Sequence, residues 1–303
     1  MTTVTVRVPA KVNLQLAVGP VRDDGYHDLV NIFHAVSLFD EVTAEPAADG
    51  VFGVAVTGTG AEHVPDDQDN LAVRAAKELA KAPGAPSGVR LAIRKAIPVA
   101  GGMAGGSADA AAALVACDRL WGIGMSRDGL AEIAARVGSD VPFALLGGTA
   151  VGTGRGERLT PAVAAGPFHW VFALADGGLS TAAVYAECDR LRAAHEEVVA
   201  WPQVDEALMA ALRSGDAVAL GGRLTNDLQP AALALRPSLD RTLTAGREHG
   251  ALGSLVSGSG PTCAFLAADA ENADDLAVAL RDAGVCREAV RAEGPVPGAT
   301  LLG

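Results

Sequence analysis

The sequence has few lysines, no long apolar run and a marked shortage of positive charge. Its 303 residues carry a formal net charge of −12, and the lysines are only Lys11, Lys77, Lys81 and Lys95. An acidic chain is a poor partner for nucleic acid or an anionic membrane surface, so we expect neither. No 18-residue stretch is free of charge, which argues against a membrane-spanning helix. The N-terminus lacks a basic segment followed by an apolar core, so no signal peptide is predicted and a cytoplasmic location is expected.

Metal-binding and disulfide patterns are also missing. The four cysteines are far apart and form no CxxC pair, and the six histidines show neither HxH nor HExxH spacing. We therefore expect the cysteines to be small buried residues in a reducing compartment, and we predict no metal-ligating residue.

A glycine-rich stretch, Pro98 to Ala113, is the most informative feature that is present. Four glycines fall between Gly101 and Gly106. The alternating pattern of Val89 to Lys95 predicts a strand before them, and a helix is expected from Ser107, as N-cap residue, to Trp121. Glycine backbone N–H groups beside a helix N-terminus form an anion cradle. A flexible Gly/Ala connection is the alternative.

Spacing excludes two common phosphate loops. Walker A needs a lysine after its last glycine, and no lysine follows Lys95. Met103 occupies the position of the second glycine in a Rossmann fingerprint. The pattern Pro-x-x-x-Gly-x-x-x-Gly-Ser-Ala instead resembles the phosphate loop of the GHMP kinases, the superfamily of galactokinase, homoserine kinase and mevalonate kinase.

Two strands are predicted near the N-terminus, an edge strand from Thr3 to Val8 that ends at Pro9 and a second from Val12 to Val18. The polar side of the second begins with Lys11 and Asn13. That side is either a solvated edge or, beside a phosphate loop, the source of a cation for the transition state.

Three further segments have both a structural and a functional interpretation. The pair Tyr26–His27 either pins a turn or stacks on a planar ligand. Asp140 either caps a turn between a helix end and a proline or accepts a hydroxyl proton in phosphoryl transfer. The run Ser257 to Thr262 is either a plain β-turn or a set of backbone amides closing over phosphates.

These segments resemble one family within the superfamily, the 4-diphosphocytidyl-2-C-methyl-D-erythritol kinases. The motifs Pro9-Ala-Lys-Val-Asn-Leu, Asp24-Gly-Tyr-His, Gly138-Ser-Asp-Val-Pro-Phe and Ser257-Gly-Ser-Gly-Pro-Thr occur in the family's order and approximate spacing. Thr225-Asn-Asp-Leu and the segment from Ser180 to Tyr185 are similar as well. The resemblance spans nearly the whole chain, from Pro9 to about Phe265.

The resemblance implies an α+β, two-domain GHMP kinase fold. A ribosomal-protein-S5-like ATP-binding domain would be followed by a ferredoxin-like substrate domain. The composition changes between Arg158 and Pro167, so the boundaries are placed at 1–157 and 158–303. The chain would act as a monomer or weak homodimer.

The resemblance also assigns the site. Lys11 and Asp140 match the catalytic pair. ATP would be a co-substrate, with Mg²⁺ bound to its phosphates. The cytidylated small-molecule substrate would contact Asn13, Tyr26, His27, Thr181 and Tyr185. ATP-binding positions would be Pro98, Val99, Ala100, Gly101, Gly102, Met103, Ala104, Gly105, Gly106, Ser107, Ala108, Asn70 and Lys95.

Alternatives to this function are a homoserine or mevalonate kinase, and a non-catalytic ligand-binding regulator on the same scaffold. The first should lack the Tyr26–His27 platform, and the second should lack Lys11 or Asp140. Asp109 departs from the expected pattern, because a carboxylate beside bound phosphates repels them unless it caps, faces away or meets magnesium.

Overall fold

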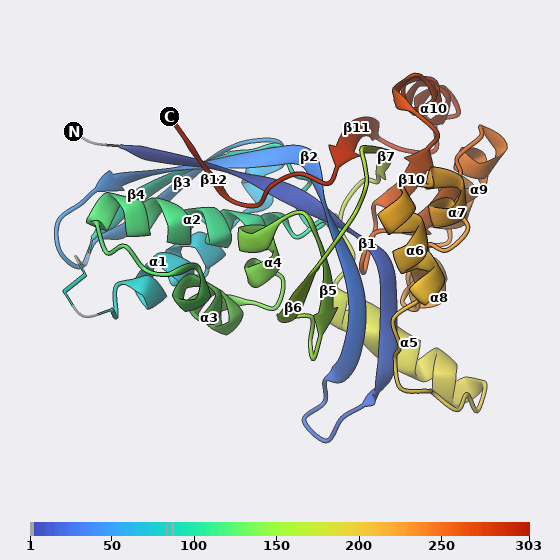
Figure 1. Ribbon diagram of the computed structural model, residues 1–303, viewed down its shortest axis with the longest axis horizontal. Helices are drawn as coiled ribbons and strands as arrows, with labels where there is room; N and C mark the ends of the chain where they lie inside the picture. The colour runs from blue at the N-terminus through green and yellow to red at the C-terminus, as the bar shows by residue number, and fades with distance from the viewer. Residues whose placement is uncertain (1–2, 83, 86–87) are drawn as a thin grey trace.

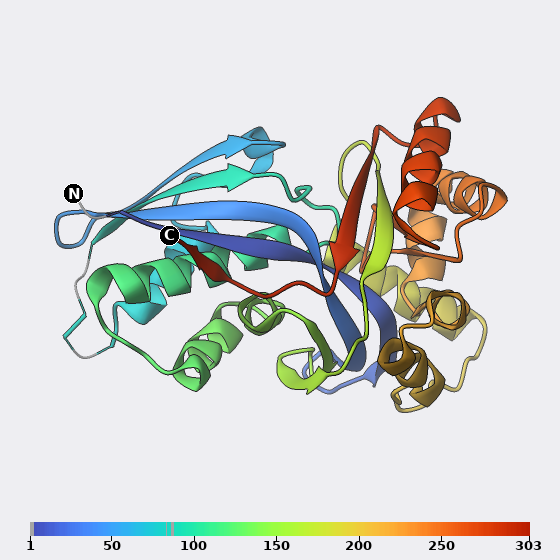
Figure 2. The ribbon, with the colours of Figure 1, turned by 45° about the horizontal axis from the view of Figure 1, so that its top comes forward.

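The computed structural model describes residues 3–82, 84–85 and 88–303, which form two β-sheets covered by helices (Figures 1 and 2). The first sheet has eight strands, with β12, β1, β2, β4 and β3 side by side, β5 joining β2 to β6, and β8 pairing with β1. Its strands are β1 (Val4–Val21), β2 (His27–Pro46), β3 (Phe52–Gly58), β4 (Val89–Lys95), β5 (Thr149–Thr153), β6 (Arg158–Ala162), β8 (Thr225–Asn226) and β12 (Thr300–Leu302).

The second sheet has four antiparallel strands in the order β11, β7, β10, β9. Their bounds are β7 (Phe168–Leu174), β9 (Gly253–Val256), β10 (Cys263–Ala267) and β11 (Glu288–Gly294). The Gly/Ser run at residues 257–262 lies between β9 and β10.

Helices cover the sheets in two groups, and Figure 2 shows the first group along one face of the first sheet. That group is α1 (Leu71–Leu79), α2 (Gly105–Trp121), α3 (Arg127–Val137) and α4 (Val141–Leu146). The second group is α5 (Thr181–Ala194), α6 (Glu206–Ser214), α7 (Ala217–Gly221), α8 (Gln229–Leu235), α9 (Ser238–Glu248) and α10 (Ala270–Asp282), and a short 3-10 helix, η1, covers Ala61–His63. Among the described residues, no helix combines the length and apolarity needed to cross a membrane.

The two predicted N-terminal strands are one strand, so the prediction that the first ends at Pro9 is wrong. Pro9 pairs with Phe39 of β2, and a register shift follows directly between Pro9 and Ala10. Such an irregularity accommodates a residue that cannot donate a ladder hydrogen bond, which lets β1 continue through the proline.

The long strands β1 and β2 connect the two halves of the molecule. The first part of β1 and the later part of β2 pack in a core with β4, α1 and α2, whereas Leu16, Val18 and Leu29 pack with buried residues of α5, α8 and α9. The strands β6, β8 and β12, all from beyond residue 157, hydrogen-bond into the first sheet. The two predicted domains therefore share a sheet, and the boundary at residues 157 and 158 stays a prediction.

Candidate active site

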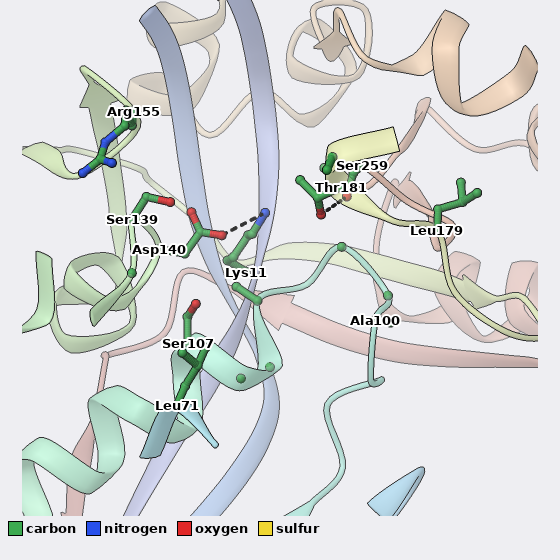
Figure 3. A pocket seen from close by; sticks show the side chains of 18 of the residues that line it. Lys11, Leu71, Ala100, Ser107, Ser139, Asp140, Arg155, Leu179, Thr181 and Ser259 are labelled. Carbon is green, nitrogen blue, oxygen red and sulfur yellow. Dashed lines mark hydrogen bonds and ion pairs between the residues drawn. The ribbon is translucent and has the colours of Figure 1, made fainter. Parts of the chain in front are cut away.

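A large cavity of about 1220 Å³ lies where the two halves meet, and Figure 3 shows side chains that line it. Its walls come from β1, β2, the glycine loop, the start of α4, the start of α5 and the turn before β10. Pockets for one ligand usually enclose about 300–1,000 Å³. The cavity therefore has room for two ligands side by side.

The glycine loop packs against the Gly/Ser turn at residues 257–262. Gly102 has φ +74°, and a Cβ there would overlap the carbonyl oxygen of Ser257. The Ser257 hydroxyl donates to the Gly102 carbonyl oxygen at 3.2 Å. A Cβ at Gly101 would lie 2.9 Å from the Thr262 hydroxyl. Glycine is thus required here by contact with another backbone segment, and the loop is packed in place.

Helix α2 begins two residues before the predicted start. Ala104, with φ 60°, precedes Gly105, and no side chain caps this end, so the prediction of Ser107 as N-cap is wrong. Because the first backbone N–H groups of a helix lack intrahelical acceptors, those of Gly105, Gly106 and Ser107 remain available. All three residues line the cavity, where they supply hydrogen-bond donors and the positive end of the helix dipole.

Lys11 is buried in this cavity, so the interpretation of its strand side as a solvated edge is wrong. Its side chain is 8% exposed, and its Nζ lies 3.9 Å from Oδ2 of Asp140 (Figure 3). It also donates to Oδ1 of Asn13 at 2.6 Å, and its backbone N–H donates to the Met103 carbonyl at 3.3 Å. Burial lowers the pKa of Lys11, and the negative charge of Asp140 acts in the opposite direction.

Asp140 stands at the N-cap position of α4 but accepts no capping hydrogen bond. The capping interpretation is therefore wrong, and the carboxylate faces Lys11 and the cavity (Figure 3). Helix α4 itself is an element that sequence reasoning did not predict. The pair can hold a hydroxyl group at Asp140 while Lys11 stabilises negative charge beside it.

Aromatic side chains line the opposite end of the cavity. His27 Nδ1 lies 2.9 Å from the Gly19 carbonyl, and because a carbonyl only accepts, Nδ1 carries the proton. The His27 ring stacks on Tyr185, with centroids 5.4 Å apart. Burial raises the pKa of Tyr185, with a smaller contribution from the charge of Asp140. Tyr26 is 54% exposed, and the Arg155 guanidinium lies over its ring at 5.2 Å.

Several lining residues were not singled out from sequence. The Thr181 hydroxyl contacts that of Ser259 at 3.0 Å, which joins the start of α5 to the Gly/Ser turn (Figure 3). Asp189 Oδ2 lies 3.4 Å from Nε2 of His27. Ser259 lies within the motif at 257–262, which already pointed to it, whereas Arg155 and Asp189 lie in segments with no comparable signal.

Two predicted nucleotide-side residues have protein partners instead. Asn70 caps α1, since its Oδ1 accepts from the Ala72 N–H at 2.9 Å and its Nδ2 donates to the Pro65 carbonyl at 2.7 Å. Lys95 is buried in ion pairs with Asp40 and Asp109. Both residues line the cavity, but direct contact with a nucleotide stays a prediction.

The donor set of the cavity does not form a metal site of its own. Within the described ranges, no group of three or more His, Cys, Asp or Glu side chains is placed to hold a metal ion. Asp140 is paired with Lys11, and Asp109 is paired with Lys95. A divalent cation here would depend on ligands carried by a phosphate substrate.

Comparisons with known proteins agree with this geometry. The GHMP kinase N-terminal domain family matches residues 70–148, and the GHMP kinase C-terminal family matches residues 208–286. A 4-diphosphocytidyl-2-C-methyl-D-erythritol kinase of Thermobifida fusca is 63% identical, covering 99% of each chain. One of Streptomyces coelicolor is 60% identical, again covering 99% of each chain.

Solved structures show the same fold. A crystal structure of 4-(cytidine 5'-diphospho)-2C-methyl-D-erythritol kinase matches with a TM-score of 0.76 and 33% identity, covering 98% of this chain and 99% of that one. A homoserine kinase from Cytophaga hutchinsonii also matches with a TM-score of 0.76, covering 100% of this chain and 98% of that one. At 19% identity this match shows the fold alone. The predicted α+β GHMP kinase fold is confirmed, and the chain belongs to the 4-diphosphocytidyl-2-C-methyl-D-erythritol kinase family.

Proposed function

We propose that this chain transfers the γ-phosphoryl group of ATP to the C2 hydroxyl of 4-diphosphocytidyl-2-C-methyl-D-erythritol. The products are the 2-phosphate and ADP, in isoprenoid precursor biosynthesis by the non-mevalonate route. The observation that carries the proposal is the Lys11–Asp140 pair, held 3.9 Å apart in the same cavity as the glycine loop. The family membership of the chain supplies the substrate.

ATP is placed along the loop from Pro98 to Ala108, with its phosphates at the open N-terminus of α2. This position is supported by the free N–H groups of Gly105, Gly106 and Ser107, which line the cavity. The backbone hydrogen bond from Lys11 to Met103 ties the loop to β1. The Lys11 side chain lines the same cavity as the loop, so we place its ammonium beside the phosphoryl group that leaves the loop.

In the transfer step, Asp140 orients the C2 hydroxyl and accepts its proton. The hydroxyl oxygen forms the new bond to the γ-phosphorus as the bond from that phosphorus to the bridging oxygen breaks, and ADP leaves with the bond's electron pair. Lys11 offsets the negative charge that spreads over the transferring group. Most of the rate enhancement then comes from orienting the hydroxyl group and stabilising the transferring charge. A carboxylate paired with a lysine can do both.

The cytidine portion is placed at the aromatic end of the cavity. Tyr26 offers an exposed ring face, His27 offers Nε2 as a hydrogen-bonding edge, and Tyr185 closes the site behind His27. Asn13 and Thr181 complete the proposed substrate contacts between this end and Lys11. Mg²⁺ is proposed to arrive bound to ATP. The oligomeric state, a monomer or a weak homodimer, remains a prediction.

ADP release with three acceptors, compared side by side, tests this function. Release is expected with 4-diphosphocytidyl-2-C-methyl-D-erythritol and not with homoserine or mevalonate. The alternative acceptors rest on solved structures at 19% and 17% identity, which show the fold alone. Release with either of them instead would overturn the substrate assignment, and no release with any acceptor would favour a non-catalytic regulator.

A further inference from the structure

A buried ion cluster lies at the base of the glycine loop and has no role in the mechanism above. It consists of Asp40 from β2, Lys95 from the end of β4 and Asp109 from α2, which are 0%, 3% and 2% exposed. Lys95 Nζ donates to Oδ2 of Asp40 and, at 2.7 Å, to Oδ2 of Asp109. Asp109 lines the cavity together with the loop, and its Oδ2 is held by Lys95.

The cluster holds both ends of the glycine loop at one point. At the entry, Oδ1 of Asp40 accepts hydrogen bonds from the backbone N–H groups of Ala96 at 2.6 Å and Ile97 at 2.8 Å. At the exit, Asp109 belongs to the second turn of α2, which begins at Gly105. Lys95 joins the two carboxylates, so the entry and the exit of the loop share a single ionic contact.

The same ammonium group lies close to the start of α2. A Cβ on Gly105 would be 3.2 Å from Lys95 Nζ, so the absence of a side chain leaves room for the lysine there. Lys95 therefore packs directly against the first turn of α2. That turn carries the free N–H groups to which the triphosphate is assigned.

The cluster contains two carboxylates and only one cation. Burial raises the pKa of Asp109 to about 7, the charge of Lys95 opposes this, and the charge of Asp40 adds to it. Among the described residues, Asp109 Oδ1 has no hydrogen-bond partner although it is buried. The elements β1, β12, α1, α3 and α4 also pack against α2, and within the described ranges they present no group that shifts this pKa.

We infer that Asp109 is a positioning residue for ATP binding, which holds the glycine loop and the start of α2 in their binding geometry through Lys95 and Asp40. This inference rests on the proposed function, in which the loop receives the triphosphate. An ionised Asp109 also leaves excess negative charge near the phosphates. ATP affinity therefore falls as the pH rises through the range in which this carboxyl loses its proton.

Two substitutions of Asp109 test the inference by steady-state kinetics at fixed free Mg²⁺. Asp109→Ala removes both the charge and the acceptor, and the KM for ATP is expected to rise about tenfold or more, the scale of losing a hydrogen bond to a charged group. The KM for the cytidylated substrate should stay within about twofold, because the hydrogen bonds described for Asn13, His27 and Thr181 involve other residues than those of the cluster. Asp109→Asn keeps an oxygen for Lys95, so its KM for ATP should stay within about threefold of wild type at pH 6.

The pH profile separates positioning from general support of the fold. Between pH 6 and 8.5 the wild-type KM for ATP should rise, whereas that of Asp109→Asn should stay level, since the amide does not titrate. Asp118→Asn is the matched control, because it removes a carboxylate from the far end of the same helix, where Oδ1 accepts from the Met125 N–H. It should leave both KM values and the fold largely unchanged, because the asparagine oxygen can still accept from Met125.

The outcomes divide clearly. If the wild-type chain releases ADP and Asp109→Ala has the wild-type KM for ATP, this inference is contradicted, whereas the proposed function is not. Equal increases in the KM of both substrates would also contradict it, because they indicate a general loss of structure. If Asp109→Ala does not fold, a pH profile of Asp109→Asn that parallels wild type overturns the inference. A wild-type chain without ADP release contradicts the proposed function and the inference with it.

Discussion

Lys11→Met is the substitution that tests the proposed catalysis most sharply. Methionine has nearly the length of lysine and suits a buried position, so the change removes the ammonium with little loss of packing. The substitution removes two interactions of the ammonium, one with Oδ2 of Asp140 at 3.9 Å and one with Oδ1 of Asn13 at 2.6 Å. Asp140 keeps contact with water, because its side chain is 30% exposed.

The expected size of the effect follows from the distance. Two unit charges 3.9 Å apart attract by about 4 kcal/mol at an effective dielectric constant of about 20. Screening by water at the partly exposed Asp140 reduces this value. A transferring phosphoryl group at a similar distance should lose about 3 kcal/mol of stabilisation, which corresponds to a fall in kcat of about 10²-fold or more.

Stability should respond differently from activity. Removing a desolvated ammonium stabilises the fold, whereas leaving Asn13 Oδ1 without its donor destabilises it by about 1–3 kcal/mol. These contributions oppose each other, so the unfolding temperature should change by only a few degrees.

The assay is ADP release at saturating concentrations of both substrates, with ATP binding measured separately by calorimetry. We expect a low kcat, a dissociation constant for ATP within a few-fold of wild type, and a cooperative thermal transition. Lys11→Ala should show the same loss of kcat. A kcat within threefold of wild type for both variants would refute the role of Lys11 in stabilising the transferring group.

Three further substitutions separate the parts of the site. Asp140→Asn should abolish ADP release while calorimetry still detects ATP binding, and an active variant would exclude Asp140 as proton acceptor. Tyr26→Ala should raise the KM for the cytidylated substrate through loss of a stacking face, and an effect confined to ATP would move Tyr26 to the other pocket. Gly102→Ala, at φ +74° and against Ser257, should weaken ATP binding by displacing the loop, and unchanged calorimetry would contradict that packing.

Local structure was largely readable from the sequence because it depends on neighbouring residues. The alternation in Val89 to Lys95 predicted β4 with its observed bounds. The glycine loop was found between a strand and a helix N-terminus, as expected. Five short motifs in one order were enough to indicate the family, although they lie far apart in the sequence and meet only in the folded cavity.

The environment of each side chain was decided only by tertiary structure. Alternation shows that Lys11 and Asn13 share one side of a strand, but not that other segments bury that side. The cap of α2 was misplaced because Ala104 adopts a left-handed conformation within a loop packed against Ser257, a residue 155 positions away from Gly102. The burial of Lys11 and the packing of the loop on Ser257 both depend on distant segments, so the local sequence pattern does not predict them.

The lysine at the end of β4 shows the same division most clearly. From sequence, the family resemblance placed Lys95 among the ATP-binding positions. In the fold, Asp40 comes from 55 residues earlier and Asp109 from 14 residues later, and together they bind that ammonium. The sequence by itself determined that a lysine stands beside the loop. Only the tertiary structure decided that this lysine is paired with two buried carboxylates, because burial requires such a charge to be paired.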